Sequence, residues 1–173
     1  MKLTVPLLAI LFLATACESG SQGETGVSPS LENQVQDAGV FGLVIGMDSS
    51  EVYSPSFFDQ MDLSDSEYRF EGEWSKAMGM TMYLTLDKGR VYEITLDMEC
   101  TTTSANDSLF QIFQGRLDEL YGKSHPAPGY ATWSTGSRTG RLVEVSLVDE
   151  SFELGRPRIM MNWLEHYDRK YSP

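Results

Sequence analysis

The sequence is poor in the residues that build metal sites and disulfide frameworks. It holds 2 cysteines and 2 histidines among 173 residues, and His125 and His166 lack the His-Glu-x-x-His spacing of a zinc site. Basic residues are also scarce, 13 against 25 acidic ones, for a formal net charge of -12. Such an acidic chain is poorly suited to nucleic acid or to anionic lipid headgroups. We therefore expect no metal, no cofactor and no nucleic-acid partner.

The N-terminal apolar run is too short to cross a bilayer, which takes ~20 residues. It extends from Leu3 to Phe12, follows the single basic residue Lys2, and leads into Leu13-Ala14-Thr15-Ala16-Cys17. Small residues before a cysteine resemble the signal peptide and lipobox of bacterial lipoproteins, in which that cysteine takes diacylglycerol. We therefore expect a signal peptide at 1–16 and a lipid anchor on Cys17. A transmembrane anchor is the weaker interpretation.

Residues 17–37 are rich in Gly, Ser, Glu and Gln, with almost no large apolar residue before Leu31. This composition predicts a flexible tether, followed by a single domain at 38–168 and a tail at 169–173. Glu18 differs from the aspartate that retains lipoproteins in the inner membrane of many enteric-type bacteria. The expected location is therefore the cell envelope, with the outer membrane favoured if the source is Gram-negative.

Strict alternation of apolar and polar residues predicts a β-hairpin in the middle of the chain. Met78 to Leu86 places methionine and leucine on one face, the run 87–90 forms the turn, and Tyr92 to Cys100 returns. Cys100 falls on the apolar face, where we expect a buried thiol. A strand is also expected over 68–72.

Two helices are expected to cover such a sheet. The first would follow Asp48 and run to about Met61, although Pro55 requires it to start late or to break. The second, capped by Thr103, Ser104 or Asn106, carries an apolar stripe up to Tyr121. Further strands are expected over 130–135, 142–148 and 159–164. We therefore predict an α+β fold in which two tandem helix-strand-strand-strand units form one antiparallel sheet with helices packed on one face.

The segment Gly46-Met47-Asp48-Ser49-Ser50-Glu51-Val52 is similar to the start of small bacterial lipoproteins of the outer-membrane assembly factor type (BamE-like). The doubled order of helix and strands also resembles the β-lactamase-inhibitor-protein architecture. These resemblances imply a non-catalytic role in binding or assembly. They assign no functional residue to this chain.

Motifs for catalysis are mostly missing. The run Gly136 to Gly140 has its serine one place too early for a nucleophile elbow and is typical of a turn. Acidic residues at Asp59, Asp62, Asp65 and Glu67 lack the glycine and closing glutamate of a calcium loop, so a solvated loop is favoured. Methionines spaced by two, including Met78 to Met82, suit core packing better than copper binding.

Aromatic residues on strands offer the best candidate binding surface, because a sheet covered on one face can present rings on the other. This surface is expected at Tyr83, Tyr130, Trp133 and Trp163. The leading hypothesis is a lipid-anchored, non-catalytic binding or assembly module with an envelope protein or glycan as partner. The alternatives are an envelope hydrolase using carboxylates that the sequence does not single out, and an inhibitor of a lysozyme or protease.

Overall fold

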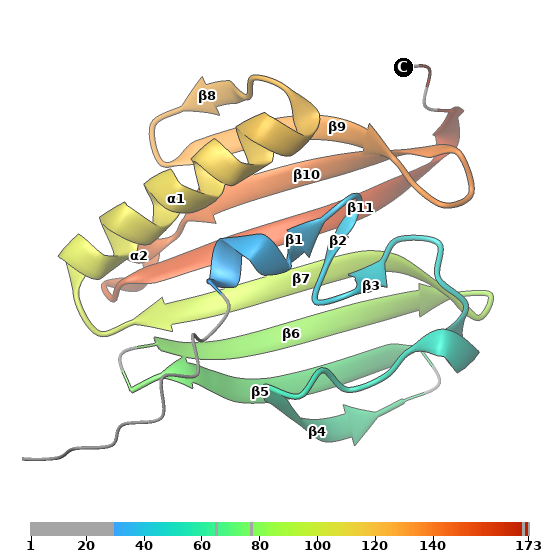
Figure 1. Ribbon diagram of the computed structural model, residues 1–173, viewed down its shortest axis with the longest axis horizontal. Helices are drawn as coiled ribbons and strands as arrows, with labels where there is room; N and C mark the ends of the chain where they lie inside the picture. Colours follow the sequence, from blue (N-terminus) through green and yellow to red (C-terminus); the bar gives the residue numbers. More distant parts are fainter. Residues whose placement is uncertain (1–29, 65, 77, 171, 173) are drawn as a thin grey trace, which may run out of the picture.

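The computed structural model describes residues 30–64, 66–76, 78–170 and 172. The expected signal peptide, Cys17 and the first part of the expected tether lie outside these residues. The centre of the fold is an eight-stranded antiparallel sheet with the order β4-β5-β6-β7-β11-β10-β9-β8 (Figure 1). Its strands are β4 (Phe58–Leu63), β5 (Glu67–Ser75), β6 (Met78–Asp87), β7 (Arg90–Cys100), β8 (His125–Ala127), β9 (Tyr130–Gly136), β10 (Arg141–Asp149) and β11 (Arg158–Lys170).

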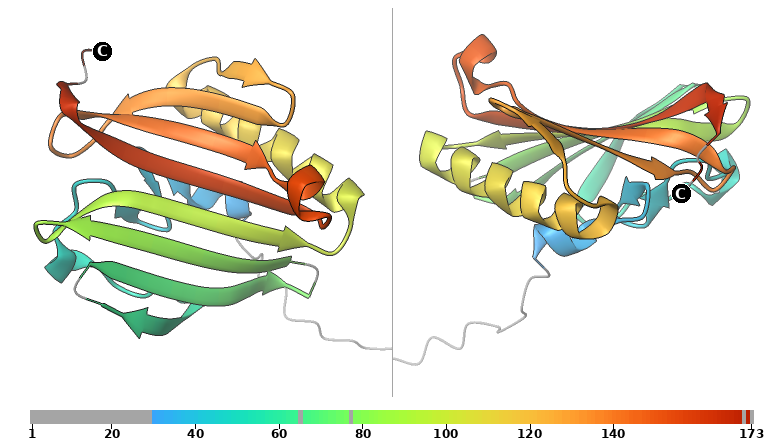
Figure 2. Two further views of the ribbon diagram at one scale, coloured as in Figure 1. Left: turned by 180° about the vertical axis from the view of Figure 1, so that it is seen from behind. Right: turned by 90° about the horizontal axis from the view of Figure 1, so that it is seen from above.

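One face of this sheet is covered. The cover consists of the helix α1 (Thr103–Tyr121) and an N-terminal segment, which holds η1 (Leu31–Gln34) and a small sheet of β1 (Val35–Gln36), β2 (Gly39–Val40) and β3 (Leu43–Val44). Figure 2 shows both on the same side of the sheet, while the opposite side is bare apart from the one-turn helix α2 (Ser151–Leu154) at one end. We call the bare side the open face.

The core lies between the sheet and its cover because the strands alternate as expected. Three residues are buried on β6, and their partners on β7 are also buried: the pairs are Met80 with Met98, Met82 with Leu96 and Leu84 with Ile94. Polar residues between them point to the open face. The hairpin over 78–100 and its facing are thus confirmed, as are the strands expected over 68–72, 130–135, 142–148 and 159–164.

The strand order is symmetric about the pair β7 and β11. Strands β4 to β7 form one meander and β8 to β11 form a second. The two meanders meet where β7 pairs antiparallel with β11. The N-terminal segment covers part of the first meander and α1 covers the second (Figure 1). Because the two cover segments differ, the meanders are not repeats of one helix-strand unit.

The predicted α+β class with tandem helix-strand units is wrong, because the first helix does not form. Asp48 caps only a 3-10 turn, η2 (Ser49–Glu51), and the chain then passes without regular structure through Pro55 and a turn at 56–57 into β4. Proline removes a helical hydrogen bond there. Phe58 is buried instead, with its ring 5.2 Å from that of Phe41 in the N-terminal segment. The fold is predominantly β with one long helix.

Two boundaries also differ from expectation. Leu31 and Val35 belong to the expected tether, yet both are buried against the core, so the ordered domain includes residues before 38. At the other end β11 continues to Lys170, into the expected tail. The cap of α1 is Thr102, whose side chain accepts a hydrogen bond from the Ala105 amide.

Candidate functional site

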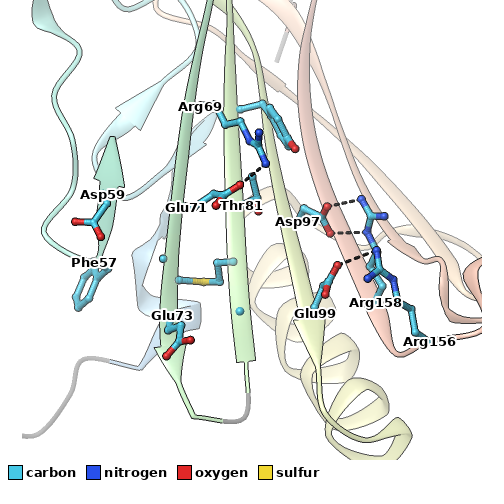
Figure 3. Close-up of a pocket in the computed structure, with 14 residues that line it drawn as sticks. Phe57, Asp59, Arg69, Glu71, Glu73, Thr81, Asp97, Glu99, Arg156 and Arg158 are labelled. Atoms are coloured by element: carbon cyan, nitrogen blue, oxygen red, sulfur yellow. Dashed lines mark hydrogen bonds and ion pairs between the residues drawn. The ribbon is translucent and has the colours of Figure 1, made fainter. Parts of the chain in front are cut away.

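The open face carries a shallow hollow of about 880 Å³ towards its β4 end. It extends from β4 and β5 across β6 and β7 to the start of β11 (Figure 3). Charged side chains dominate its lining, and the labelled ones in Figure 3 are Asp59, Arg69, Glu71, Glu73, Asp97, Glu99, Arg156 and Arg158. We call it the open-face hollow.

The most buried charged pair of the hollow joins β7 to β11. Asp97 is only 7 % exposed, and both of its carboxylate oxygens accept hydrogen bonds from the guanidinium of Arg158. The Arg158 Nε also lies 3.2 Å from a carboxylate oxygen of Glu150. Hydrogen bonding to Asp97 raises the pKa of Arg158. This bidentate pair fixes the orientation of the guanidinium plane against the carboxylate plane, and it forms one wall of the hollow.

Two further ion pairs stand nearer to solvent. Arg156 lies 2.9 Å from a carboxylate oxygen of Glu99, with both side chains about half exposed. Arg69 pairs with Glu71 along β5, and its guanidinium lies 5.8 Å from the ring centroid of Tyr83. All three arginines of the hollow are therefore engaged by carboxylates.

The carboxylates outnumber these arginines. Five carboxylates line the hollow against three arginines, a balance of -2. Asp59 and Glu73 are exposed and form no ion pair with any other described residue. Figure 3 places both on the β4 and β5 side, across from Arg156 and Arg158. The unpaired negative charge of the hollow is thus concentrated along one side.

The four aromatic residues expected to form a binding surface lie on different faces. Tyr83 borders the open-face hollow, and Tyr130 is 38 % exposed on β9. Trp133 and Trp163 are buried in the core, where their indole N–H groups donate to Asp118 and to Tyr121. These two tryptophans therefore contribute nothing to the open face.

The methionines behave mostly as core residues. Met78, Met80, Met82 and Met161 are buried among apolar side chains, whereas Met160 is half-buried on β11. Cys100 is a free cysteine at the end of β7, half-buried rather than fully buried, and desolvation raises the pKa of its thiol. The thiol packs at the edge of the core.

Other expected features can be placed as well. The run 136–140 is a turn, in which the Ser137 hydroxyl oxygen accepts hydrogen bonds from the backbone amides of Thr139 and Arg141. Across the described part of the chain, no three His, Cys, Asp or Glu side chains are grouped to hold a metal ion. Asp65 of the acidic run lies outside the described residues. None of the described helices has the length and apolar character needed to span a membrane.

Sequence reasoning missed the paired charges of the hollow. Asp97 and Arg158 lie far apart in sequence and are brought together by the register of β7 and β11, in which Asp97 faces Met160 and Glu99 faces Arg158. The available signal was the polar side of the predicted β7 strand, where Asp97 and Glu99 alternate with core residues. Their partners depend on which strand lies next to β7.

Comparison with known proteins adds no relative to this picture: no protein-family model, no curated protein and no solved structure matches the chain.

Proposed function

We propose that this chain is a lipid-anchored protein of the bacterial cell envelope that binds a partner and catalyses no reaction. The anchor rests on the lipobox-like segment ending at Cys17. The observation that carries the binding role is the open face, a broad polar side of an eight-stranded sheet with a hollow that the described residues leave uncovered. A sheet exposed in this way presents a large, stiff surface for docking.

The partner is a protein that presents lysine or arginine side chains. Among the described residues Asp59 and Glu73 of the open-face hollow form no ion pair, and its arginines are already engaged by other carboxylates. A basic side chain placed beside Asp59 or Glu73 would gain an ionic contact without breaking an ion pair of the hollow. The formal charge of -12 steers the approach of such a partner.

A hydrolase is the second candidate, since the hollow holds several carboxylates. Glycoside hydrolysis needs one carboxyl group that stays protonated as an acid. Here Glu71, Asp97 and Glu99 are each held in an ion pair with an arginine instead of standing free towards a substrate. The arrangement therefore favours binding.

Site-specific photo-crosslinking in cells tests the proposal. A photoreactive residue at Tyr83 should form a defined adduct with a protein, and Asp59→Lys combined with Glu73→Lys should reduce that adduct at least tenfold. The adduct should also weaken as salt rises, because the contacts are ionic. The same photoreactive residue at Ile112, exposed on α1, is the matched control.

Three outcomes contradict the proposal. Adducts of equal yield from positions 83 and 112 would mean that the open face is not a preferred surface. An adduct that resists protease but is removed by glycosidases would identify a glycan as the partner. Turnover of an envelope glycan by the purified protein, abolished by Glu71→Gln or Asp97→Asn, would establish a hydrolase.

A further inference from the structure

A second hollow opens where β7 and β11 separate. The ladder between these strands ends at Glu93 and Leu164. β11 pairs with β10 along its other edge. There Glu165 pairs with Val143, and the next pair is Lys170 with Arg141. Four residues of β11, 166–169, therefore lie opposite the single β10 residue Leu142. Extra residues of this kind bend a strand away from its neighbours, and such irregularities often border functional sites.

The hollow formed there measures about 340 Å³. Its lining comes from the β6–β7 turn, the turn before β10 and the end of β11, and consists of Asp87, Lys88, Arg90, Tyr92, Thr139, Arg141, Glu165 and Tyr167. Glu165 alternates with the buried Trp163, so the hollow lies on the side of the sheet opposite the open face. We call it the β7–β11 hollow.

A buried carboxylate organises one wall of this hollow. The Glu165 side chain is 5 % exposed and accepts hydrogen bonds of 2.6 Å from the Thr139 hydroxyl and 3.2 Å from the Arg141 guanidinium. That guanidinium also lies 5.1 Å from the ring centroid of Tyr167. Arg141 is therefore held in place by two neighbours, while its side chain remains 40 % exposed.

Two aromatic rings also line this hollow. The ring centroids of Tyr92 and Tyr167 are 6.0 Å apart, and two further surface depressions, one lined by Leu86 and one by Leu164, also border both rings. The Tyr167 hydroxyl donates to Asp87, and desolvation together with that bond raises the pKa of Tyr167 to about 12. The phenol is therefore neutral near pH 7 and would not repel an anion.

The remaining charges are positive. Glu165 forms an ion pair with Arg141, and Asp87 accepts a hydrogen bond from the Tyr167 hydroxyl. Lys88 and Arg90 are exposed and form no ion pair with another described residue, although hydrogen bonds from Ser50 and, to a smaller extent, the charge of Arg90 lower the pKa of Asp48. Three cations thus line a hollow with two carboxylates, in a chain whose net charge is -12.

We propose that the β7–β11 hollow binds a small ligand carrying a phosphate or carboxylate group, with the anion held by Lys88, Arg90 and Arg141 and the body of the ligand against Tyr92 and Tyr167. Both anions present oxygen atoms to guanidinium and ammonium groups, which is the chemistry that these three side chains supply. The site does not depend on the open face, because different residues and the other side of the sheet form it.

NMR titration of the isotopically labelled full chain with inorganic phosphate, and separately with acetate, tests this site. Saturable shifts are expected at the amides of Lys88, Arg90 and Arg141. Lys88→Glu combined with Arg90→Glu should weaken the binding at least tenfold. Both side chains are exposed, so the variant is expected to fold, and an unchanged amide spectrum elsewhere checks this. Tighter binding of phosphate than acetate would identify a phosphate-bearing ligand, and the reverse order a carboxylate-bearing one.

Lys123→Glu combined with Lys76→Glu is the matched control, because it changes the net charge by the same amount at exposed positions away from the hollow. It should leave the affinity nearly unchanged. Absence of saturable shifts with either anion would overturn the proposal, as would equal weakening by the two double variants. The Asp59 and Glu73 variants of the open face should bind phosphate normally, so failure here is distinct from failure of the open-face proposal.

Discussion

Two arginines, Arg158 at the start of β11 and Arg156 just before it, illustrate how burial decides the value of an ion pair. Arg158 and Arg156 both pair with β7 carboxylates, but the Asp97 side chain is 10 % exposed whereas that of Glu99 is 49 % exposed. A carboxylate that loses its partner in the interior cannot be compensated by water, while an exposed one can. Loss of the arginine partner should therefore cost more stability at Asp97 than at Glu99, two residues further along β7.

Arg158→Met is expected to lower the free energy of unfolding by about 3 kcal/mol, because it leaves the Asp97 carboxylate buried and unpaired. Arg156→Met should cost less than about 1 kcal/mol, since Glu99 stays hydrated. Urea unfolding followed by circular dichroism measures both. Equal losses in the two variants would show that Asp97 is accessible to water.

Tyr167 should titrate far above an ordinary tyrosine. Its folded pKa is about 12, raised first by desolvation and then by Asp87, against about 10 in an unfolded chain. The neutral phenol is favoured by folding, so this contribution to stability is complete below pH 10 and is lost as pH rises from 10 towards 12. The difference in tyrosinate absorbance between the wild type and Tyr167→Phe should show a transition near pH 12.

Asp87→Asn is the control for that titration, because it removes the negative charge that holds the Tyr167 proton. The transition should move towards pH 10. A difference spectrum that already shows an ordinary transition near pH 10 in the wild type would mean that the Tyr167 hydroxyl does not form the hydrogen bond to Asp87.

Cys100 should react slowly while the protein is folded. Partial burial raises the pKa of its thiol, which reduces the fraction of thiolate at pH 8. In the Cys17→Ser chain, alkylation by iodoacetamide at pH 8 should be several-fold slower than in urea, with half-maximal reactivity at a higher pH. Equal rates in the two conditions would place the thiol fully in solvent.

At the level of elements, the sequence predicted those whose periodicity was uninterrupted. Met78 to Leu86 alternates without a break and α1 keeps its apolar stripe, and both formed as expected. The segment from Asp48 to Leu63 combined a helix cap with apolar residues of mixed spacing. There Pro55 and strand pairing with β5 excluded the expected helix. Gly72 accommodates this pairing, because a Cβ at that position would lie 2.1 Å from the Phe57 carbonyl oxygen.

The helix α1 should contribute to stability through one face only. Phe113 is fully buried against the sheet, whereas its neighbour Ile112 is 47 % exposed. Phe113→Ala is expected to lower the free energy of unfolding by about 3 to 5 kcal/mol through the cavity that it leaves. Ile112→Ala should change it by less than about 1 kcal/mol. Similar losses from both would contradict the placement of α1 on the sheet.

At the level of the whole molecule, strand order determines both candidate sites. Arg158 meets Asp97, and Tyr167 meets Tyr92, only because β11 returns beside β7. Alternation along one strand indicates which side chains share a face, but not which strand lies next to it. The polar residues of the open face were therefore predictable and their partners were not. The two buried tryptophans were misplaced for a related reason, since aromatic side chains suit either face of a sheet.

The two hollows also differ in the sign of their charge. Within the part of the chain that the structure describes, the open-face hollow has carboxylates without an ion-pair partner at Asp59 and Glu73, and the β7–β11 hollow has such cations at Lys88 and Arg90. The first suits a basic protein partner and the second a small anion. The two proposed sites therefore lie on opposite sides of one sheet and suit ligands of opposite charge.

Attachment to the membrane is the property on which the proposed location depends. If Cys17 carries diacylglycerol, Cys17→Ser should accumulate as an uncleaved precursor or as a protein released from the membrane fraction, because the acyl chains supply the anchoring free energy. Fractionation of cells, with metabolic labelling by a radioactive fatty acid, measures both. Cys100→Ser is the matched control and should keep both the label and the membrane fraction. Unchanged fractionation of Cys17→Ser would show that another segment holds the protein at the membrane.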